Sequence, residues 1–119
     1  MQIGTGFLRC PEAKTAPAWA DAIGRAAPED TAVMRVFTGR PARGIVNDYL
    51  RAATSPDAPT PAPYPVQSRL AYPLRMAAAK AGDTSRMTMW AGQSASLARA
   101  EPAADLAVRL WAEAQALLR

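Results

Sequence analysis

The chain has 119 residues, which is enough for one compact domain and too short for two of ordinary size. Half of the residues are hydrophobic, but alanine supplies much of that half and buries little area per residue, so we expect a thin core. The net charge of +4 comes with basic residues spread between Arg9 and Arg119, and this spread argues against a nucleic-acid-binding face.

Two residue types limit the chemistry. The sequence has no histidine, which excludes a Ser-His-Asp or Cys-His nucleophile, an imidazole metal ligand and a histidine base. Its single cysteine, Cys10, excludes an internal disulfide and leaves no cysteine pair for zinc. No stretch approaches the ~18 apolar residues of a membrane span, and no signal-peptide pattern is present, so we expect a cytoplasmic protein without membrane contact.

The N-terminal segment, MQIGTGFL, is short, apolar and rich in glycine. It predicts the end of a strand at Gln2-Ile3, which runs into a tight turn at Gly4-Thr5-Gly6. Pro17 suits the first turn of a helix, which we expect over residues 17–26.

A strand, a turn and a helix are predicted next. Residues 31–37, TAVMRVF, alternate and include β-branched side chains, which favours a short strand. In the turn that follows, Gly39 can take a positive φ, and Pro41 pushes Arg40 toward an extended conformation. Residues 42–53 carry apolar side chains on one helical face, so a helix is expected there.

The middle of the chain is rich in proline. Residues 54–65, TSPDAPTPAPYP, contain five prolines, which predicts an extended connector on the surface. Residues 66–81 are expected to be helical, with a kink at Pro73 and an end at Gly82.

The C-terminal part predicts two more helices, one starting near Ser94 and one over residues 103–118. The last helix has an apolar stripe of period 3.6, which we expect to pack against residues 42–53 and 66–81. Asp105 and Arg109 are expected to pair on its opposite face. The whole pattern predicts a mostly helical fold with one or two short strands.

Two segments could carry chemistry. At Gly4-Thr5-Gly6, glycine would let backbone N–H groups approach an anion, and the threonine hydroxyl adds a donor; a simple turn is the alternative. At Trp90 to Ser94, Gly92 lies between an indole and the amide of Gln93 and would suit a flat aromatic ligand. The alternative there is core, a bend and a helix N-cap. Cys10 is expected to be a buried structural thiol, because no histidine or lysine next to it in the sequence would lower its pKa.

Four segments, taken in order, resemble one family. They are QIGTGFLRCPEA (residues 2–13), FTGRPARGIVNDYL (37–50), PYPVQ (63–67) and WAGQSASLARAEPAADLAVRLWAEA (90–114). The first is similar to the eighth barrel strand of nitronate monooxygenases, also called 2-nitropropane dioxygenases, where a similar run reads QIGTAF. The others are similar to the SGRPAR-type turn, the YPxQ stretch, and the WAGQ segment with the last helix of that family. Gly6 departs from a common alanine, and Thr38 replaces the usual serine.

The resemblance covers this chain and only the C-terminal third or so of the family. Family members are FMN enzymes on a (β/α)8 TIM barrel that oxidise alkyl nitronates with molecular oxygen. The resemblance therefore implies a helical C-terminal subdomain plus the last barrel strand. It divides the chain into that strand and its turn (1–10), a helix-strand-helix unit (11–53), the connector (54–65) and a helical segment (66–119).

The resemblance also implies the site residues. Gly4 and Thr5 match the strand end that approaches the flavin phosphate, and Gly92 and Gln93 match the segment that closes over the flavin. The family's catalytic histidine and glycine-rich phosphate loop have no counterpart here, so no catalytic or metal-binding residue is assigned. We expect the chain alone to be inactive, and its partner to be the remaining N-terminal barrel or a second copy.

Two other interpretations remain. One is an FMN-dependent enoyl-acyl carrier protein reductase, whose C-terminal region also carries an AGQ-like segment; residues 37–50 favour the monooxygenase. The other is a non-catalytic helical remnant or a module that docks on a partner barrel.

Overall fold

The computed structural model describes residues 2–119, and about half of them are helical. The helices are α1 (Gly4–Phe7), α2 (Pro17–Arg25), α3 (Asp48–Ala53), α4 (Val66–Ala81) and α5 (Ala103–Leu117). The 3-10 turns are η1 (Pro11–Ala13), η2 (Pro28–Asp30) and η3 (Ala95–Leu97). Strands β1 (Thr31–Met34) and β2 (Ala42–Ile45) form an antiparallel sheet. The mixture agrees with the predicted mostly helical fold with one or two short strands.

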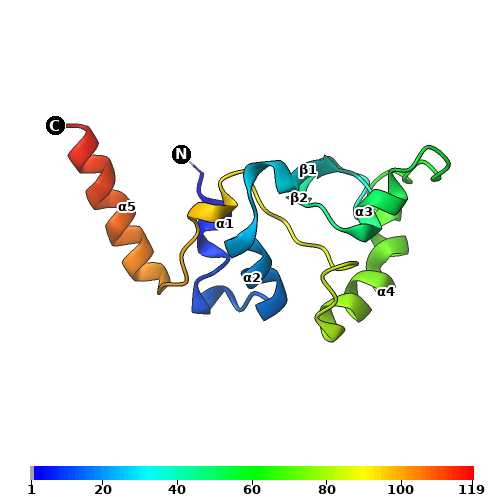
Figure 1. The fold of residues 1–119 in the computed structure, drawn as a ribbon, viewed down its shortest axis with the longest axis horizontal. Helices are drawn as coiled ribbons and strands as arrows, with labels where there is room; N and C mark the ends of the chain where they lie inside the picture. The colour runs from blue at the N-terminus through cyan, green and yellow to red at the C-terminus, as the bar shows by residue number, and fades with distance from the viewer. Residues whose placement is uncertain (1) are drawn as a thin grey trace.

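The molecule is elongated, with extents of 53 × 28 × 24 Å. Figure 1 shows α5 standing at one end, α3 and α4 at the other, and α2 and the sheet between them. Both chain termini lie at the α5 end of the molecule, and the middle of the sequence forms the other end. This arrangement separates α5 from the helices on which it was expected to pack.

The sheet is a hairpin in which Thr31 pairs with Ile45 and Met34 pairs with Ala42. Its connection passes through Gly39, whose φ of 86° lies in the left-handed region that favours glycine. A Cβ atom on Gly39 would lie 2.6 Å from the carbonyl oxygen of Ala62, so the turn packs directly on the proline-rich connector. The predicted turn at Gly39 is confirmed.

The single helix predicted over residues 42–53 is wrong in its first half. Residues Ala42–Ile45 are β2, and the helix α3 begins only at Asp48. The backbone N–H of Ile45 donates to the carbonyl oxygen of Met89 at 2.8 Å, so β2 has hydrogen-bonded neighbours on both edges. Those ladder bonds outweigh the helical spacing of the apolar side chains, and Gly44 is a poor helix former. Tertiary contacts therefore determine the secondary structure of this segment.

The N-terminal turn also differs from its prediction. Gly4–Phe7 is the helix α1, closed by a hydrogen bond from the N–H of Leu8 to the carbonyl oxygen of Thr5 at 3.1 Å. Gln2 and Ile3 are not in a strand, and none of the strands in residues 2–119 pairs with them. A strand needs a hydrogen-bonded neighbour, so the expected last barrel strand does not form here. Met1, which belonged to that prediction, lies outside the described residues.

Helices α2 and α4 lie where the sequence predicted them. Pro17 is the first residue of α2, and α4 continues through Pro73 and ends at Gly82, which has a left-handed conformation. The helix expected from Ser94 is much shorter, because only the single 3-10 turn η3 forms.

Two clusters of buried side chains form the core. The larger one joins α2, β2, α4 and the segment before η3, and comprises Ile23, Ala26, Ile45, Ala78, Met87, Met89, Ala91, Ala95 and Ala98. The smaller one, Met34, Val36, Phe37 and Leu50, lies between the sheet and α3. Alanine supplies five of the nine residues in the larger cluster, as the expected thin core requires.

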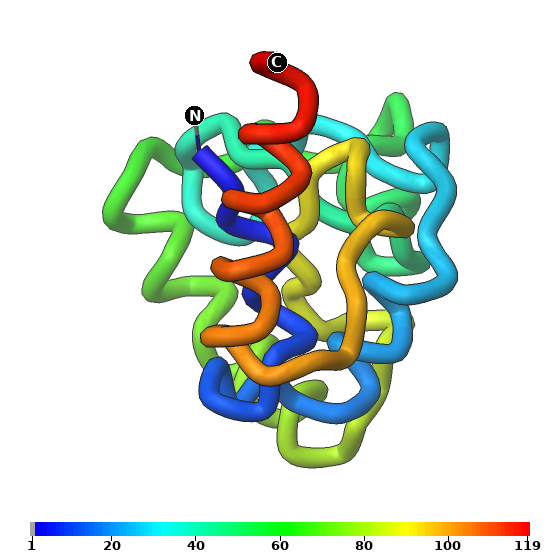
Figure 2. The backbone as a smooth tube through the Cα atoms, turned by 90° about the vertical axis from the view of Figure 1, so that its left-hand side faces the viewer, coloured from blue at the N-terminus to red at the C-terminus, as the bar shows by residue number. Residues whose placement is uncertain are grey.

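Helix α5 exists as predicted, but its expected packing is wrong. Leu106 is its one buried residue, whereas Trp111 is 64% exposed and Leu118 is 84% exposed. The predicted Asp105–Arg109 pair is also absent: Arg109 donates to Glu101 and, at 3.1 Å, to Glu113. Figure 2 shows α5 running alongside the N-terminal segment, with no helix on its outer side.

Candidate functional site

A hydrogen bond joins the two segments that sequence analysis singled out. The backbone N–H of Gly92 donates to Oγ1 of Thr5 at 2.9 Å, across 87 residues of chain. All four predicted site residues, Gly4, Thr5, Gly92 and Gln93, line one cavity of about 520 Å³. The cavity lies between α1, the segment that ends in η3, and α5.

The cavity side of this contact is open at both glycines. A Cβ atom on Gly4 would meet no heavy atom within 4 Å, and one on Gly92 would lie 3.6 Å from Oγ1 of Thr5. The Thr5 hydroxyl oxygen accepts the Gly92 bond, and within residues 2–119 its hydrogen makes no other hydrogen bond, so it can donate to a ligand. An open backbone and such a hydroxyl donor suit an anionic group such as a phosphate.

A strand-like segment beside β2 determines the position of Gly92. Residues 89–91 run along the outer edge of β2, with an antiparallel bridge between Gly44 and Trp90. The N–H of Ala91 donates to the carbonyl oxygen of Arg43 at 3.3 Å, which complements the Ile45 bond on the same edge. Buried and partly exposed residues alternate from Met87 to Ala91 in the structure, but Thr88 is the one polar residue in this stretch, so the sequence carried only a weak strand signal.

The side of the cavity formed by α5 carries an ion-pair network. The Arg109 guanidinium donates to the Glu101 carboxylate, and both side chains are at least three-quarters buried. This hydrogen bond holds the pKa of Glu101 below its ordinary value. The same guanidinium bonds Glu113, so two carboxylates already neutralise Arg109. Arg99 also lines the cavity and adds a positive charge there.

Cys10 has no role in this site. Its side chain is buried, and burial raises the pKa of the thiol, as do the negative charges of Glu12 and Glu101. A thiol of raised pKa is a poor nucleophile at neutral pH, as the sequence predicted. Within residues 2–119, no three acidic or cysteine side chains gather as a metal site would require. None of the helices in this part is long and apolar enough to cross a membrane.

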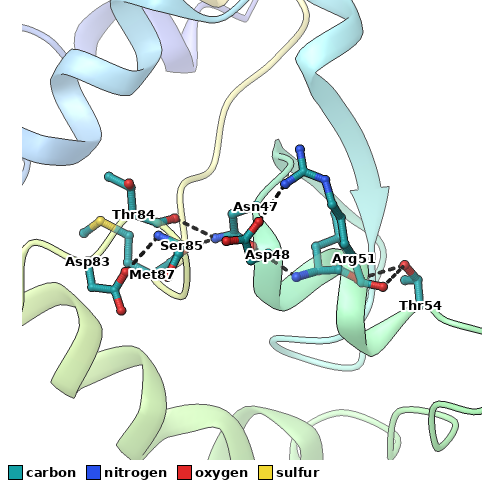
Figure 3. Close-up of polar contacts among 9 residues, drawn as sticks. Asn47, Asp48, Arg51, Thr54, Asp83, Thr84, Ser85 and Met87 are labelled. Atoms are coloured by element: carbon teal, nitrogen blue, oxygen red, sulfur yellow. Dashed lines mark hydrogen bonds and ion pairs between the residues drawn. The ribbon is translucent and has the colours of Figure 1, made fainter.

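A second cavity, of about 470 Å³, lies between α2, β2 and α3. Asn47 lines this cavity, and Figure 3 shows its side chain reaching toward the loop that carries Thr84 and Met87. The buried Asn47 amide donates to the carbonyl oxygens of Thr84 at 3.1 Å and Met87 at 2.9 Å, and its oxygen accepts from Leu50 N–H at 3.1 Å. Every hydrogen-bonding group of this side chain is used within the protein, so its role is structural. Sequence analysis missed it, because an N-capping asparagine looks the same whether or not it also joins a distant loop.

Comparison with known proteins gives the family. Residues 1–113 match the family described as nitronate monooxygenase. The chain belongs to the nitronate monooxygenase family. The resemblance seen in the four motif segments is thereby confirmed.

Individual relatives agree with this family. Probable nitronate monooxygenases of Staphylococcus aureus strains Newman and JH9 are 36% and 37% identical over 103 residues. Each match covers 87% of this chain and 29% of the relative, so the chain spans less than a third of the curated nitronate monooxygenases it matches.

Two solved structures give the fold. A nitroalkane oxidase from Streptomyces ansochromogenes superposes with a TM-score of 0.86 at 43% identity, covering 99% of this chain and 34% of its own. A FabK mutant from Thermotoga maritima superposes with a TM-score of 0.70 at 24% identity, covering 98% and 33%. Both neighbours are TIM-barrel enzymes, and the second likeness extends to the fold alone.

Proposed function

We propose that this chain forms the C-terminal part of an FMN-dependent nitronate monooxygenase, which oxidises alkyl nitronates with molecular oxygen. Its membership of the family supports this proposal. The observation that carries it is the bond between Gly92 and Thr5, which brings the predicted phosphate-binding and flavin-covering segments to one cavity. When bound there, FMN would supply the redox chemistry of the reaction.

In this proposal, Gly4 and Thr5 bind the flavin phosphate. The space beside the Cα atom of Gly4 is open, so a phosphate oxygen can approach the backbone closely. The Thr5 hydroxyl hydrogen supplies a directed donor, and Arg99 on the same cavity supplies positive charge. Hydrogen bonds to a charged acceptor contribute about 1.5–3 kcal/mol each, so the hydroxyl alone would affect FMN affinity measurably.

Gly92 and Gln93 would lie over the flavin. Gly92 brings its backbone to the cavity without a side chain, and Gln93 is exposed, with an amide able to donate and to accept. The cavity volume, about 520 Å³, lies within the range of ordinary small-molecule sites. The size and the donors therefore suit a cofactor of this class.

The partner that we propose is the rest of the barrel, packed on the apolar face of α5. Val108, Trp111 and Leu118 are 71%, 64% and 84% exposed, and large apolar side chains this exposed usually mark an interface. The match to the nitroalkane oxidase includes 99% of this chain, so α5 takes a similar pose in a protein about three times as long. That likeness favours the barrel over self-association as the cover for this face.

The chain contributes binding and not proton transfer. It has no histidine, and its thiol is buried with a raised pKa. We therefore expect the 119-residue chain with added FMN to consume no oxygen in the presence of an alkyl nitronate, as measured with an oxygen electrode. Oxygen uptake above that of free FMN would contradict this expectation.

The reductase alternative has less support. The FabK likeness, at 24% identity, extends to the fold alone, whereas the nitronate monooxygenase matches reach 36% identity and above. The remnant alternative predicts no flavin contact from any of the four site residues.

A chimera tests the proposed function. The matched third of the Streptomyces ansochromogenes protein is replaced by this chain, and FMN binding and nitronate-dependent oxygen uptake are measured. We expect a chimera that binds FMN and consumes oxygen, and at least about tenfold weaker FMN binding with Thr5→Val, which removes one charged hydrogen bond. Thr60→Val, at an exposed position of the connector, is the matched control. A folded chimera that binds no FMN would overturn the proposal.

A further inference from the structure

We infer that Trp19 is a positioning residue for Gly92 and Gln93, and that it acts through the carbonyl group of Trp90. This inference rests on the proposed function, in which those two residues lie against the flavin. The indole Nε1–H of Trp19 donates to the carbonyl oxygen of Trp90 at 3.1 Å. Trp19 belongs to α2, which the sequence places 71 residues away.

Along residues 89–92 the backbone hydrogen-bonding groups alternate in direction, as they do in a strand. Met89 and Ala91 direct their hydrogen-bonding groups to β2, as the bonds to Ile45 and Arg43 require. Successive residues of a strand point their N–H and C=O groups to opposite edges. Trp90 and Gly92 therefore direct theirs to the outer edge, where no further strand pairs with them in residues 2–119.

Two side chains take the place of that missing strand. The Trp19 indole satisfies the outward carbonyl of Trp90, and the Thr5 hydroxyl satisfies the outward N–H of Gly92. An unsatisfied strand edge at this point would fray, because partly buried backbone groups need partners. Trp19 thus holds Trp90 in place. The chain reaches the cavity two residues later, at Gly92.

The opposite side of the segment leaves it little freedom. A Cβ atom on Gly44 would lie 2.9 Å from the carbonyl oxygen of Met89, so the close approach of β2 to this segment requires a glycine at position 44. The rings of Phe37 and Trp90 meet edge to face with centroids 6.0 Å apart. Because β2 and Phe37 hold the segment at residues 89–92 on one side, the Trp19 hydrogen bond determines the position of that segment from the other side.

The test uses the full 119-residue chain and the pair Trp19→Phe and Trp111→Phe. Trp19→Phe keeps an aromatic ring and removes the indole donor, whereas Trp111 is exposed and donates no hydrogen bond within the described residues. Amide hydrogen exchange is followed by NMR, and FMN affinity by quenching of FMN fluorescence. We expect Trp19→Phe to speed exchange at Gly92 about tenfold, the effect of losing one hydrogen bond, and to weaken FMN binding several-fold. Local exchange in α4 should change much less than exchange at Gly92, and Trp111→Phe should leave both near those of the parent.

Three results would overturn the inference. They are unchanged exchange at Gly92 in Trp19→Phe, faster exchange everywhere at once, and an indole proton of Trp19 in the parent that exchanges as fast as that of Trp111. The last measurement needs no variant, so it decides the matter even if Trp19→Phe does not fold. If the parent binds no FMN while Gly92 exchange responds as expected, the positioning role stands and FMN binding by this chain fails.

Discussion

Helices α2 and α5 were both predicted from the sequence, α2 from its first-turn proline and α5 from its apolar stripe, and they have opposite surroundings. Both have apolar residues on one face, and a proline stands at or just before the start of each. In α2 the apolar face is covered, and Ile23 is 0% exposed. In α5 only Leu106 is buried, and Leu117 and Leu118 are more than four-fifths exposed. An apolar periodicity predicts a helix and its apolar side, but it does not say which segment covers that side.

The difference also indicates where this fold depends on something more. The body formed by α2, the sheet and α4 has its own core, whereas α5 has an apolar stripe without a cover in residues 2–119. Because the relatives are about three times as long, we propose that their remaining barrel provides that cover.

The largest effect is expected where the body is most tightly packed. Ile23→Ala removes a side chain with no exposed area from the larger cluster, which should cost about 2–5 kcal/mol of unfolding free energy. Leu118→Ala, on the uncovered stripe of α5, should cost less than about 0.5 kcal/mol. Urea denaturation followed by circular dichroism measures both. Equal losses would show that a second copy already covers α5 in solution.

The next effect concerns the loop that Asn47 fastens to α3. Asn47→Ala leaves the carbonyl oxygens of Thr84 and Met87 without their donor, which should destabilise the body by about 2–3 kcal/mol. Arg51→Ala, which removes an exposed ion pair with Asp48 a turn away, should change stability by less than about 0.5 kcal/mol. The same denaturation experiment compares them. A small loss for Asn47→Ala would mean that water replaces the side chain.

A smaller effect is expected where the body holds the start of α5. Both oxygens of the Glu12 carboxylate lie 3.2 Å from the N–H of Ala103, so Glu12 caps this helix from a distance of 91 residues. Glu12→Ala should cost about 0.5–1 kcal/mol in the stability of α5, because the helix loses a cap and a charge at its positive end. The exchange rates of the first amides of α5 report this loss. Glu29→Ala, an exposed acid elsewhere, should leave those rates unchanged.

The smallest effect is the pH dependence of the pair that ties α5 to the preceding loop. The Arg109 hydrogen bond lowers the folded-state pKa of Glu101, so the pair contributes stability above the ordinary glutamate pKa. That contribution is lost as the pH falls through the lowered folded value. NMR titration of the Glu101 carboxyl carbon should give a pKa below the ordinary 4.5, and Arg109→Gln should raise it toward that value. An unchanged titration in Arg109→Gln would mean that the two side chains do not pair in solution.

Local signals predicted much of the fold. Pro17 and Gly82 mark the ends of helices where the sequence placed them, and Gly39 makes the expected turn. The largest errors involve long-range partners. Residues 42–45 have the spacing of a helix and become β2 because β1 and residues 89–91 offer hydrogen bonds.

The candidate site was predicted by motif, and its assembly was not. Thr5 and Gly92 were singled out separately, and no local feature of either segment predicts that they touch. Trp19 was not singled out, because an indole on an apolar helical face is usually core. Hydrogen bonds between side chains and distant carbonyl groups leave no periodicity, so only the folded chain reveals them.

The packing of Gly39 on the proline-rich connector affects where the connector can change in length. The second half of the connector is held in place, because Gln67 donates to the carbonyl oxygen of Val36 at 2.7 Å and accepts from the N–H of Ala62 at 3.0 Å. The first half, residues 55–60, has only local hydrogen bonds. Residues inserted there would lengthen the loop at a small entropic cost and leave the entry into α4 unchanged. This stretch is therefore a natural place for a tag, a label or a second domain.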